Sequence, residues 1–218
     1  MLRQWVPAMR PTACSICTSE QASWFGAVQR TSRVDPLTAV DSVCFADSED
    51  YLLIATQECA GASIRWGIEA LGFSPDAFQG FEDMAAGATR KPDMAMFFPW
   101  FAGERVLIDD ERIREGLANL SRATDRAQIA FALYEGVGLN ARWAMRPFDR
   151  LSERAGQTLR MGGGAPGAVS GARFLPTYRD DPFSVWKCPN SVAHGQRHGR
   201  CARLRMVWRF AVDGPHDA

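Results

Sequence analysis

Apolar and polar positions change their spacing several times along the middle of the chain, as expected where strands and helices alternate. Residues 51–56, YLLIAT, form a short apolar run that predicts a buried strand, and residues 94–98 predict another. Residues 59–71 follow the first run with helical spacing. The apolar face of this expected helix is formed by Ile64, Ile68 and Leu71. Gly72 is placed to end it.

The clearest helix covers residues 125–145. Thr124 or Asp125 is placed to be the N-cap, and if Asp125 is the cap, Gln128 stands where the partner in a capping box belongs. The apolar stripe of this helix comprises Ile129, Ala132, Leu133, Val137 and Ala141. We expect Pro147 to end the helix, because proline lacks the N–H that a helix interior uses. A short strand at 158–161 follows, and the alternation predicts an α/β domain.

Composition adds a few exclusions. The 218 residues carry no net charge, and the hydrophobic fraction of 46% is ordinary for a globular protein. We find no apolar run long enough to span a membrane and no secretory signal, so we expect a cytoplasmic protein with reduced thiols. The tail after residue 166 is basic but lacks the interleaved aromatic residues of a nucleic-acid surface, so we expect no nucleic-acid partner.

Short motifs carry the candidate chemistry. The glycines at 162–164 follow the last strand, and glycine lets backbone amides approach a phosphate or a purine edge, although such runs are also common in plain turns. Residues 61–66, GASIRW, open the first helix, where Gly61 is equally a small residue for helix packing. Residues 22–26 read ASWFG. Residues 101–105, FAGER, we interpret as a structural turn in which Glu104 and Arg105 pair.

In this order the motifs resemble the C-terminal domain of the FGGY carbohydrate kinases, most closely the xylulose kinases. GASIRW resembles the GASIQW of glycerol kinases in the same superfamily, and ASWFG resembles the end of the family's GTSSWFG phosphate loop. The resemblance implies an α/β fold, an incomplete ribonuclease-H-like (actin-like ATPase) domain. It also implies a sugar kinase that uses ATP and Mg²⁺ to phosphorylate a pentulose or related sugar.

The resemblance implies five nucleotide-binding residues: Ser23, Gly61, Arg65, Gly163 and Gly164. Arg65 stands where glycerol kinases have glutamine, and Glu20 and Gln21 replace the Gly-Thr of the phosphate loop. No catalytic residue carries over, because the family's catalytic aspartate and sugar-binding domain have no counterpart here. Asp109 and Asp110 are paired carboxylates in a predicted linker. We therefore expect an inactive fragment or, alternatively, a non-catalytic remnant with at most weak nucleotide binding.

A weaker alternative is a zinc-binding module. The pattern C-x5-H-x3-H-x2-C is formed by Cys188, His194, His198 and Cys201, and Cys14 and Cys17 stand near the other end. These residue types suit zinc, but the spacing fits no standard finger. We therefore assign no metal ligand.

The two ends of the chain, 1–20 and 166–218, depart from the family pattern. The tail is rich in turn residues, and we expect neither the helix nor the last strand of the family there. Reading APGAVSGARFLPTYR from the third base of chosen codons gives PRGRLWRQISADLSR, which looks like the missing helix. The same shift turns MRPTACSICTSEQ into AAYRLLHLYIGTS, similar to the sequence before the phosphate loop. We hypothesise out-of-frame ends, the tail poorly ordered, around a partial kinase domain at 21–165.

Overall fold

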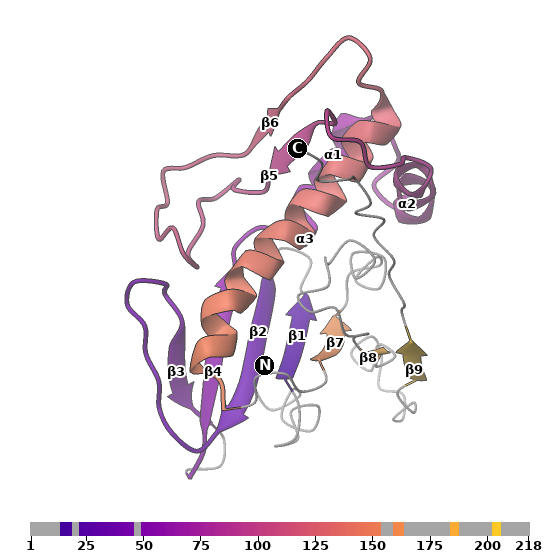
Figure 1. Cartoon of the computed structure of the whole chain (residues 1–218). Coiled ribbons are helices and arrows are strands. Elements are labelled where there is room, and N and C mark those ends of the chain that lie inside the picture. Colours follow the sequence, from indigo (N-terminus) through magenta and orange to yellow (C-terminus); the bar gives the residue numbers. More distant parts are fainter. Residues whose placement is uncertain are drawn as a thin grey trace, which may run out of the picture.

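The computed structural model describes residues 14–18, 22–45, 49–153, 159–163, 184–187 and 202–205. These ranges form two sheets and three helices (Figure 1). In spatial order, the seven strands of the larger sheet are β3 (Asp41–Cys44), β4 (Tyr51–Gln57), β2 (Ser23–Gln29), β1 (Cys14–Thr18), β7 (Leu159–Gly163), β8 (Ser184–Lys187) and β9 (Ala202–Arg205). The smaller sheet pairs β5 (Met96–Phe98) with β6 (Gly116–Ala118). The helices are α1 (Gly61–Ala70), α2 (Phe78–Ala86) and α3 (Arg126–Leu151).

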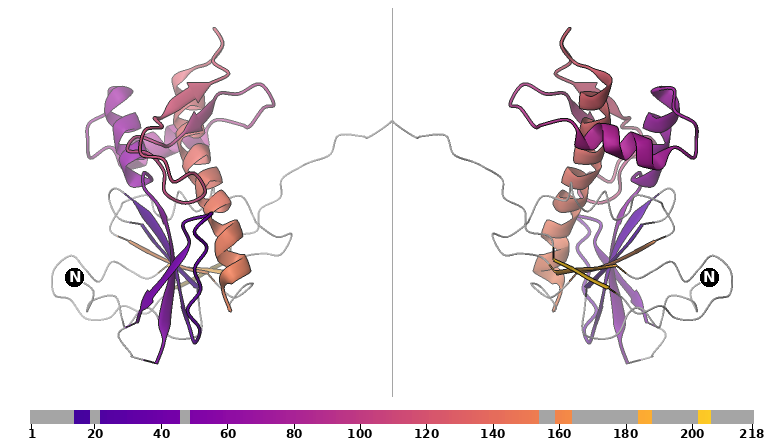
Figure 2. Two further views of the ribbon diagram at one scale, coloured as in Figure 1. Left: turned by 90° about the vertical axis from the view of Figure 1, so that its left-hand side faces the viewer. Right: turned by 90° about the vertical axis from the view of Figure 1, so that its right-hand side faces the viewer.

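The larger sheet is mixed. Strand β2 is antiparallel to both of its neighbours, β1 and β4, and β7 and β8 run parallel to β1. The carboxyl ends of β1, β4 and β7 therefore lie along one edge of the sheet, together with the amino end of β2. Helix α3 lies against one face of the sheet, which the two turned views show from either side (Figure 2).

The C-terminal half of α3 packs on the sheet. Alternate side chains of β2 and β4 point to the same face, as the pleat of a strand requires. They meet small and aromatic residues of α3 in one core, formed by Phe25, Ala27, Val40, Leu53, Ala55, Val106, Ala141, Ala144, Met145 and Phe148. Phe25 and Phe148 bring their rings to 6.5 Å between centroids. This contact fixes the C-terminal half of α3 against β2.

The N-terminal half of α3 makes a second core with α1, α2 and β5. Its members include Ile64, Ile68, Phe81, Phe97, Ala130 and Leu133. Glycines allow the close approach of the elements here. A Cβ on Gly136 of α3 would stand 2.2 Å from the carbonyl oxygen of Phe97, and a Cβ on Gly67 of α1 would stand 2.4 Å from Leu133. Helix α3 thus joins both cores.

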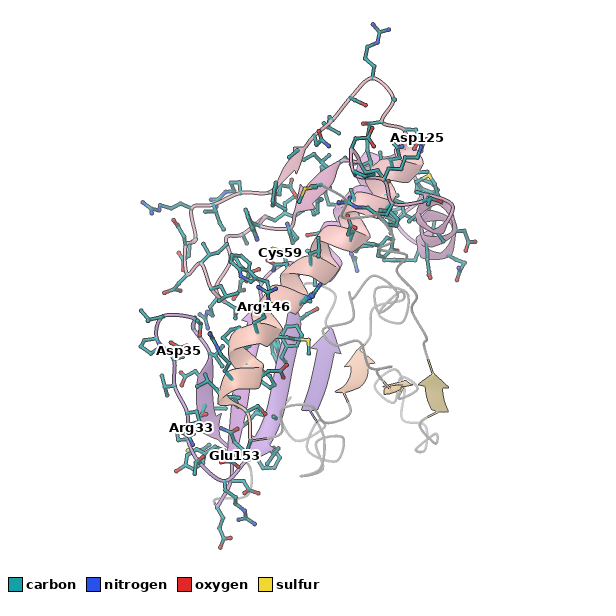
Figure 3. The ribbon with its side chains drawn as sticks, in the orientation of Figure 1. Arg33, Asp35, Cys59, Asp125, Arg146 and Glu153 are labelled. Carbon is teal, nitrogen blue, oxygen red and sulfur yellow. The ribbon has the colours of Figure 1, made fainter. Side chains whose placement is uncertain are left out.

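Both ends of α3 are held by side-chain hydrogen bonds. Asp125 accepts from the backbone N–H of Gln128, and Gln128 returns a bond to the N–H of Asp125, so the predicted capping box is confirmed. At the other end, Glu153 accepts from the backbone N–H groups of Arg30 and Thr31. Figure 3 marks Asp125 and Glu153 at these two ends.

The prediction that Pro147 ends the helix is wrong. Pro147 lies inside α3, which continues to Leu151. The physical reason is tertiary: Phe148 is 2% exposed in the core, and Leu151 packs against the same cluster. Their burial outweighs the cost of one missing backbone bond.

The remaining sequence predictions divide clearly. The strand at 51–56, the helix at 59–71 and the strand at 94–98 are confirmed within a few residues by β4, α1 and β5, and Gly72 has the expected positive φ, +73°. The sequence did not predict α2, β3 or β6, and β2 was interpreted only as a phosphate loop. The expectation of no strand in the tail is wrong, since β8 and β9 extend the sheet beyond β7. The strand predicted at 158–161 is β7.

We expect Gly136→Ala to destabilise the fold by about 2 kcal/mol, because overpacking against a backbone oxygen exceeds the gain in helix propensity. Gly80 in α2 is the matched control, since the nearest atom to an added Cβ there is 3.9 Å away. Gly80→Ala should be neutral or stabilising by up to about 1 kcal/mol. Urea denaturation of the variants measures both, and equal effects would contradict the close contact of α3 with β5.

Candidate functional site

One edge of the larger sheet collects most of the sequence-predicted site. Ser23 is paired with Gln57 of β4 on one side and with Thr18 of β1 on the other, and Thr18 is paired with Gly163 of β7. Ser23 and Gly163 therefore lie in one row, two strand spacings or about 10 Å apart. The row crosses four neighbouring strands at the point where three of them end.

Gly61 follows Gln57 of this row by four residues. It is the first residue of helix α1, separated from Gln57 at the end of β4 by a turn at 58–60. Ala60 at the N-cap makes no side-chain cap hydrogen bond, and the first turn holds no acidic residue. The first N–H groups of the helix thus receive no bond from the N-cap side chain, and the helix dipole favours an anion at this end. This end of α1 fits a phosphate group.

Two buried polar atoms flank Gly61. Gln57 and Ser63 are both fully buried, and Oε1 of Gln57 and Oγ of Ser63 have no hydrogen-bond partner in the part of the chain that the structure describes. Buried polar atoms are rarely left unpaired.

The other predicted residues are placed as follows. Ser23 is 4% exposed, whereas the neighbouring Trp24 is half exposed, because successive strand side chains point to opposite faces. Arg65 lies exposed one turn into α1. Gly164 lies outside the described residues. The structure thus brings Ser23, Gly61 and Gly163 to one edge, with Arg65 on the helix that begins there.

A buried carboxylate lies directly behind this edge. Glu104 is 3% exposed, and its Oε1 accepts from the backbone N–H of Glu58 at 3.2 Å and of Arg105 at 2.9 Å. Its Oε2 accepts from Nδ2 of Asn140 at 2.5 Å. Burial raises the pKa of Glu104, although the bonds from Asn140 and the two amides act in the opposite direction. Asn140 could not be identified from a motif, because its only sequence signal is a polar residue on the buried face of α3.

The turn that carries Glu104 differs from the expected one. Glu104 does not pair with the guanidinium of Arg105; that group lies instead 3.7 Å from Oε1 of Glu58, a largely exposed pair of small energetic value. Gly103 has a φ of +84°, and a Cβ there would stand 2.5 Å from Cα of Glu111. The turn therefore requires glycine at this position.

The two adjacent carboxylates, Asp109 and Asp110, have different surroundings. Asp109 is exposed, as expected, but Asp110 exchanges backbone hydrogen bonds with Glu104. Its carboxylate accepts from Nε and Nη2 of Arg112, which lowers the pKa of Asp110 to about 2. Asp110 is thus engaged in holding the turn rather than free in a linker.

Metal-binding clusters and membrane-spanning helices were the two remaining kinds of feature to consider. Within the described ranges, no group of three His, Cys, Asp or Glu residues is arranged to hold a metal ion. The residues of the zinc pattern, Cys188, His194, His198 and Cys201, lie outside those ranges, so that alternative stays untested. None of the described helices is both long and apolar enough to cross a bilayer.

A family model describing the C-terminal domain of the FGGY family of carbohydrate kinases matches residues 18–195. This is most of the chain, and the chain belongs to that family. The match begins just before the row of site residues and passes Ala165, the expected end of the family pattern.

Individual relatives agree. A xylulose kinase of Staphylococcus epidermidis is 25% identical over 137 residues, which are 63% of this chain and 26% of that protein. A glycerol kinase of Herminiimonas arsenicoxydans is 30% identical over 118 residues, 53% of this chain and 23% of that protein. The crystal structure of a gluconate kinase from Lactobacillus acidophilus superimposes with a TM-score of 0.69 at 19% identity, covering 86% of this chain and 37% of that one. The chain thus spans about a quarter of the length of these curated relatives, and the expected ribonuclease-H-like fold is confirmed.

The buried Glu104 predicts a pH effect. Because its folded-state pKa is raised above the ordinary 4.5, its contribution to stability is fully present below that pH and is lost as pH rises through the folded pKa. The stability of the protein relative to Glu104→Gln should therefore fall from pH 4 towards neutrality. Urea midpoints of both proteins across this range measure the difference. A difference that rises with pH would contradict the dominance of burial.

Proposed function

We propose that this chain supplies the nucleotide-binding domain of an ATP-dependent sugar kinase resembling xylulose kinase. The proposed substrate is a pentulose or related sugar. The observation that carries the proposal is the single row formed by Ser23, Gly163 and the start of α1 at Gly61. Three segments far apart in sequence meet there, and two of them supply a glycine, which lets a phosphate or purine approach the backbone closely.

In this proposal, the N–H groups at the start of α1 bind phosphate oxygens of the nucleotide. Gly61 and Gly163 let the backbone come close because neither has a side chain. The serine hydroxyl at Ser23 and the guanidinium of Arg65 are further donors for phosphate oxygens. When bound, MgATP supplies the phosphoryl group, with the metal neutralising charge on the phosphates. No Mg²⁺ ligand is assigned to this chain.

We further propose that the 218-residue polypeptide alone does not transfer phosphate to a sugar. A general base must reach the sugar hydroxyl within hydrogen-bond distance. The carboxylates behind the proposed site are already engaged: Glu104 is buried with three donors, and Glu58 lies beside Arg105. The proposed catalytic base and the sugar contacts therefore belong to another domain, and the chain acts alone only as a weak nucleotide binder.

Gly61→Val should weaken nucleotide binding at least about tenfold, because a branched side chain blocks close approach to the helix start. Binding of a ribose-labelled fluorescent ADP to the purified chain, with unlabelled ADP as competitor, measures the change. Gly80→Ala in α2 is the control and should bind as the unaltered chain does. Equal binding by Gly61→Val and the control would contradict the proposed site.

The polypeptide should show no sugar-dependent ADP release with xylulose and MgATP. A coupled assay measures this, with an active xylulose kinase added last to show that every reagent works. Turnover above the no-sugar rate by the purified chain alone would refute the proposed lack of activity while leaving family membership intact.

We propose, finally, that residues 1–20 and 166–218 are translated out of frame around the domain at 21–165. The support is the family-like sequence obtained at both ends with one shift; the family match to residues 18–195 in the given frame is the observation that stands against it. Sequencing the DNA on both sides of the reading frame tests it directly. Family sequence continuing in the shifted frame is the expected result, and its absence would reject the proposal.

A further inference from the structure

We propose that Glu104 is a positioning residue that sets the turn at 58–60 and thereby the start of α1 for nucleotide binding. The inference rests on the proposed function, because it assigns a role to a residue behind the proposed nucleotide edge. Glu104 itself contacts no nucleotide in this account. It acts through the backbone of Glu58, three residues before Gly61.

The contacts form a buried chain across three elements. Trp100 Nε1 donates to Oδ1 of Asn140 at 3.2 Å, and Asn140 Nδ2 donates to Glu104 at 2.5 Å. Glu104 then accepts from the backbone N–H of Glu58 at 3.2 Å. Asn140 belongs to α3, so the chain connects the long helix to the end of β4. Both Glu104 and Asn140 are buried, at 3% and 7% exposure.

The turn at 58–60 has no capping side chain at its end, since its last residue, Ala60, is the N-cap of α1. Neighbouring side chains hold it instead. The backbone N–H of Glu58 donates to Glu104, and the carboxylate of Glu58 lies 3.7 Å from Nε of Arg105. Gln57 Nε2 donates to the carbonyl oxygens of Cys59 at 3.4 Å and of Val137 at 3.2 Å. A shift of the turn would leave buried polar groups unpaired, which is costly.

The groups around Glu104 are consistent with a carboxylate that is held in one position and accepts hydrogen bonds. Glu58 and Cys59 face it from the turn at the end of β4, and Arg105 follows it in sequence. Burial raises the pKa of the Cys59 thiol, and the nearby Glu104 and Glu58 raise it further. Asn140 is neutral and donates from α3. A carboxylate accepts through both oxygens at once, which glutamine cannot do without turning an N–H towards a donor.

Glu104→Gln and Glu104→Ala in the full chain test the proposal. Amide hydrogen exchange is measured without nucleotide at Glu58, Ile64 and Arg65, and ADP affinity is measured separately. In Glu104→Ala we expect exchange at these amides to rise about tenfold and ADP binding to weaken about tenfold, because hydrogen bonds to a buried charge are lost. Glu104→Gln should give the same pattern with smaller changes.

Glu135→Gln is the matched control. Glu135 is a partly buried carboxylate on α3 that pairs with Arg90 at 2.8 Å rather than with the backbone of the turn at 58–60. This variant should leave exchange at 58–65 and ADP affinity unchanged. If Glu104→Ala does not fold, Trp100→Phe replaces it; removal of the indole N–H should raise the same exchange about threefold.

The outcomes are separable. Exchange that rises equally in β2 and α3 would show a merely structural role and overturn the proposal, as would unchanged exchange at Ile64 and Arg65. Local loosening together with weaker ADP binding supports it. Local loosening in a chain that binds no ADP, altered or unaltered, would confirm the control of the turn and refute the proposed function alone.

Discussion

The close approach of α3 to β5 is the constraint on which this fold depends. At Gly136 the helix backbone lies so near the carbonyl oxygen of Phe97 that a Cβ would stand 2.2 Å from it. One half of α3 then packs on β2 and β4, and the other half packs on α1 and α2. A helix held further away could not fill both cores at native packing density. Helix α1 packs on the N-terminal half of this same helix.

The proposed site follows from strand direction and register. Three strands end at one edge, and the pairings of Ser23, Thr18 and Gly163 align residues that are more than a hundred positions apart. Behind that edge, the buried chain through Glu104 and Asn140 connects the start of α1 to α3. The same helix therefore supports the core and the candidate nucleotide edge. Disturbing α3 should affect both.

Local signals in the sequence were sufficient for the elements that carry their own caps and periodicity. Asp125 and Gln128 marked the start of α3, and the spacing of Ile64 and Ile68 marked α1. Long-range contacts could not be deduced in this way. Pro147 remains helical because Phe148 is buried, and Glu104 bonds to Asn140, 36 positions later, rather than to Arg105. Tertiary packing decides such cases over local propensity.

In the candidate site, too, local motifs could be recognised from the sequence but long-range contacts could not. The family-like motifs led to Ser23, Gly61 and Gly163, which the structure brings to one edge, but nothing in the motifs pointed to Gln57, Trp100 or Asn140 behind it. Short strands such as β8 and β9 were also missed, because four residues carry too little periodicity. They form because β7 and β8 present open edges for pairing.

Photoaffinity labelling with an azidoadenine analogue of ATP tests the central claim most directly. The full chain is irradiated with the analogue, with and without excess ADP, and the labelled peptides are identified by mass spectrometry. We expect label that ADP suppresses within residues 57–66 and 159–163, where the strand ends and α1 meet. Label concentrated on α2, or label that ADP does not suppress, would contradict the nucleotide site at this edge of the sheet.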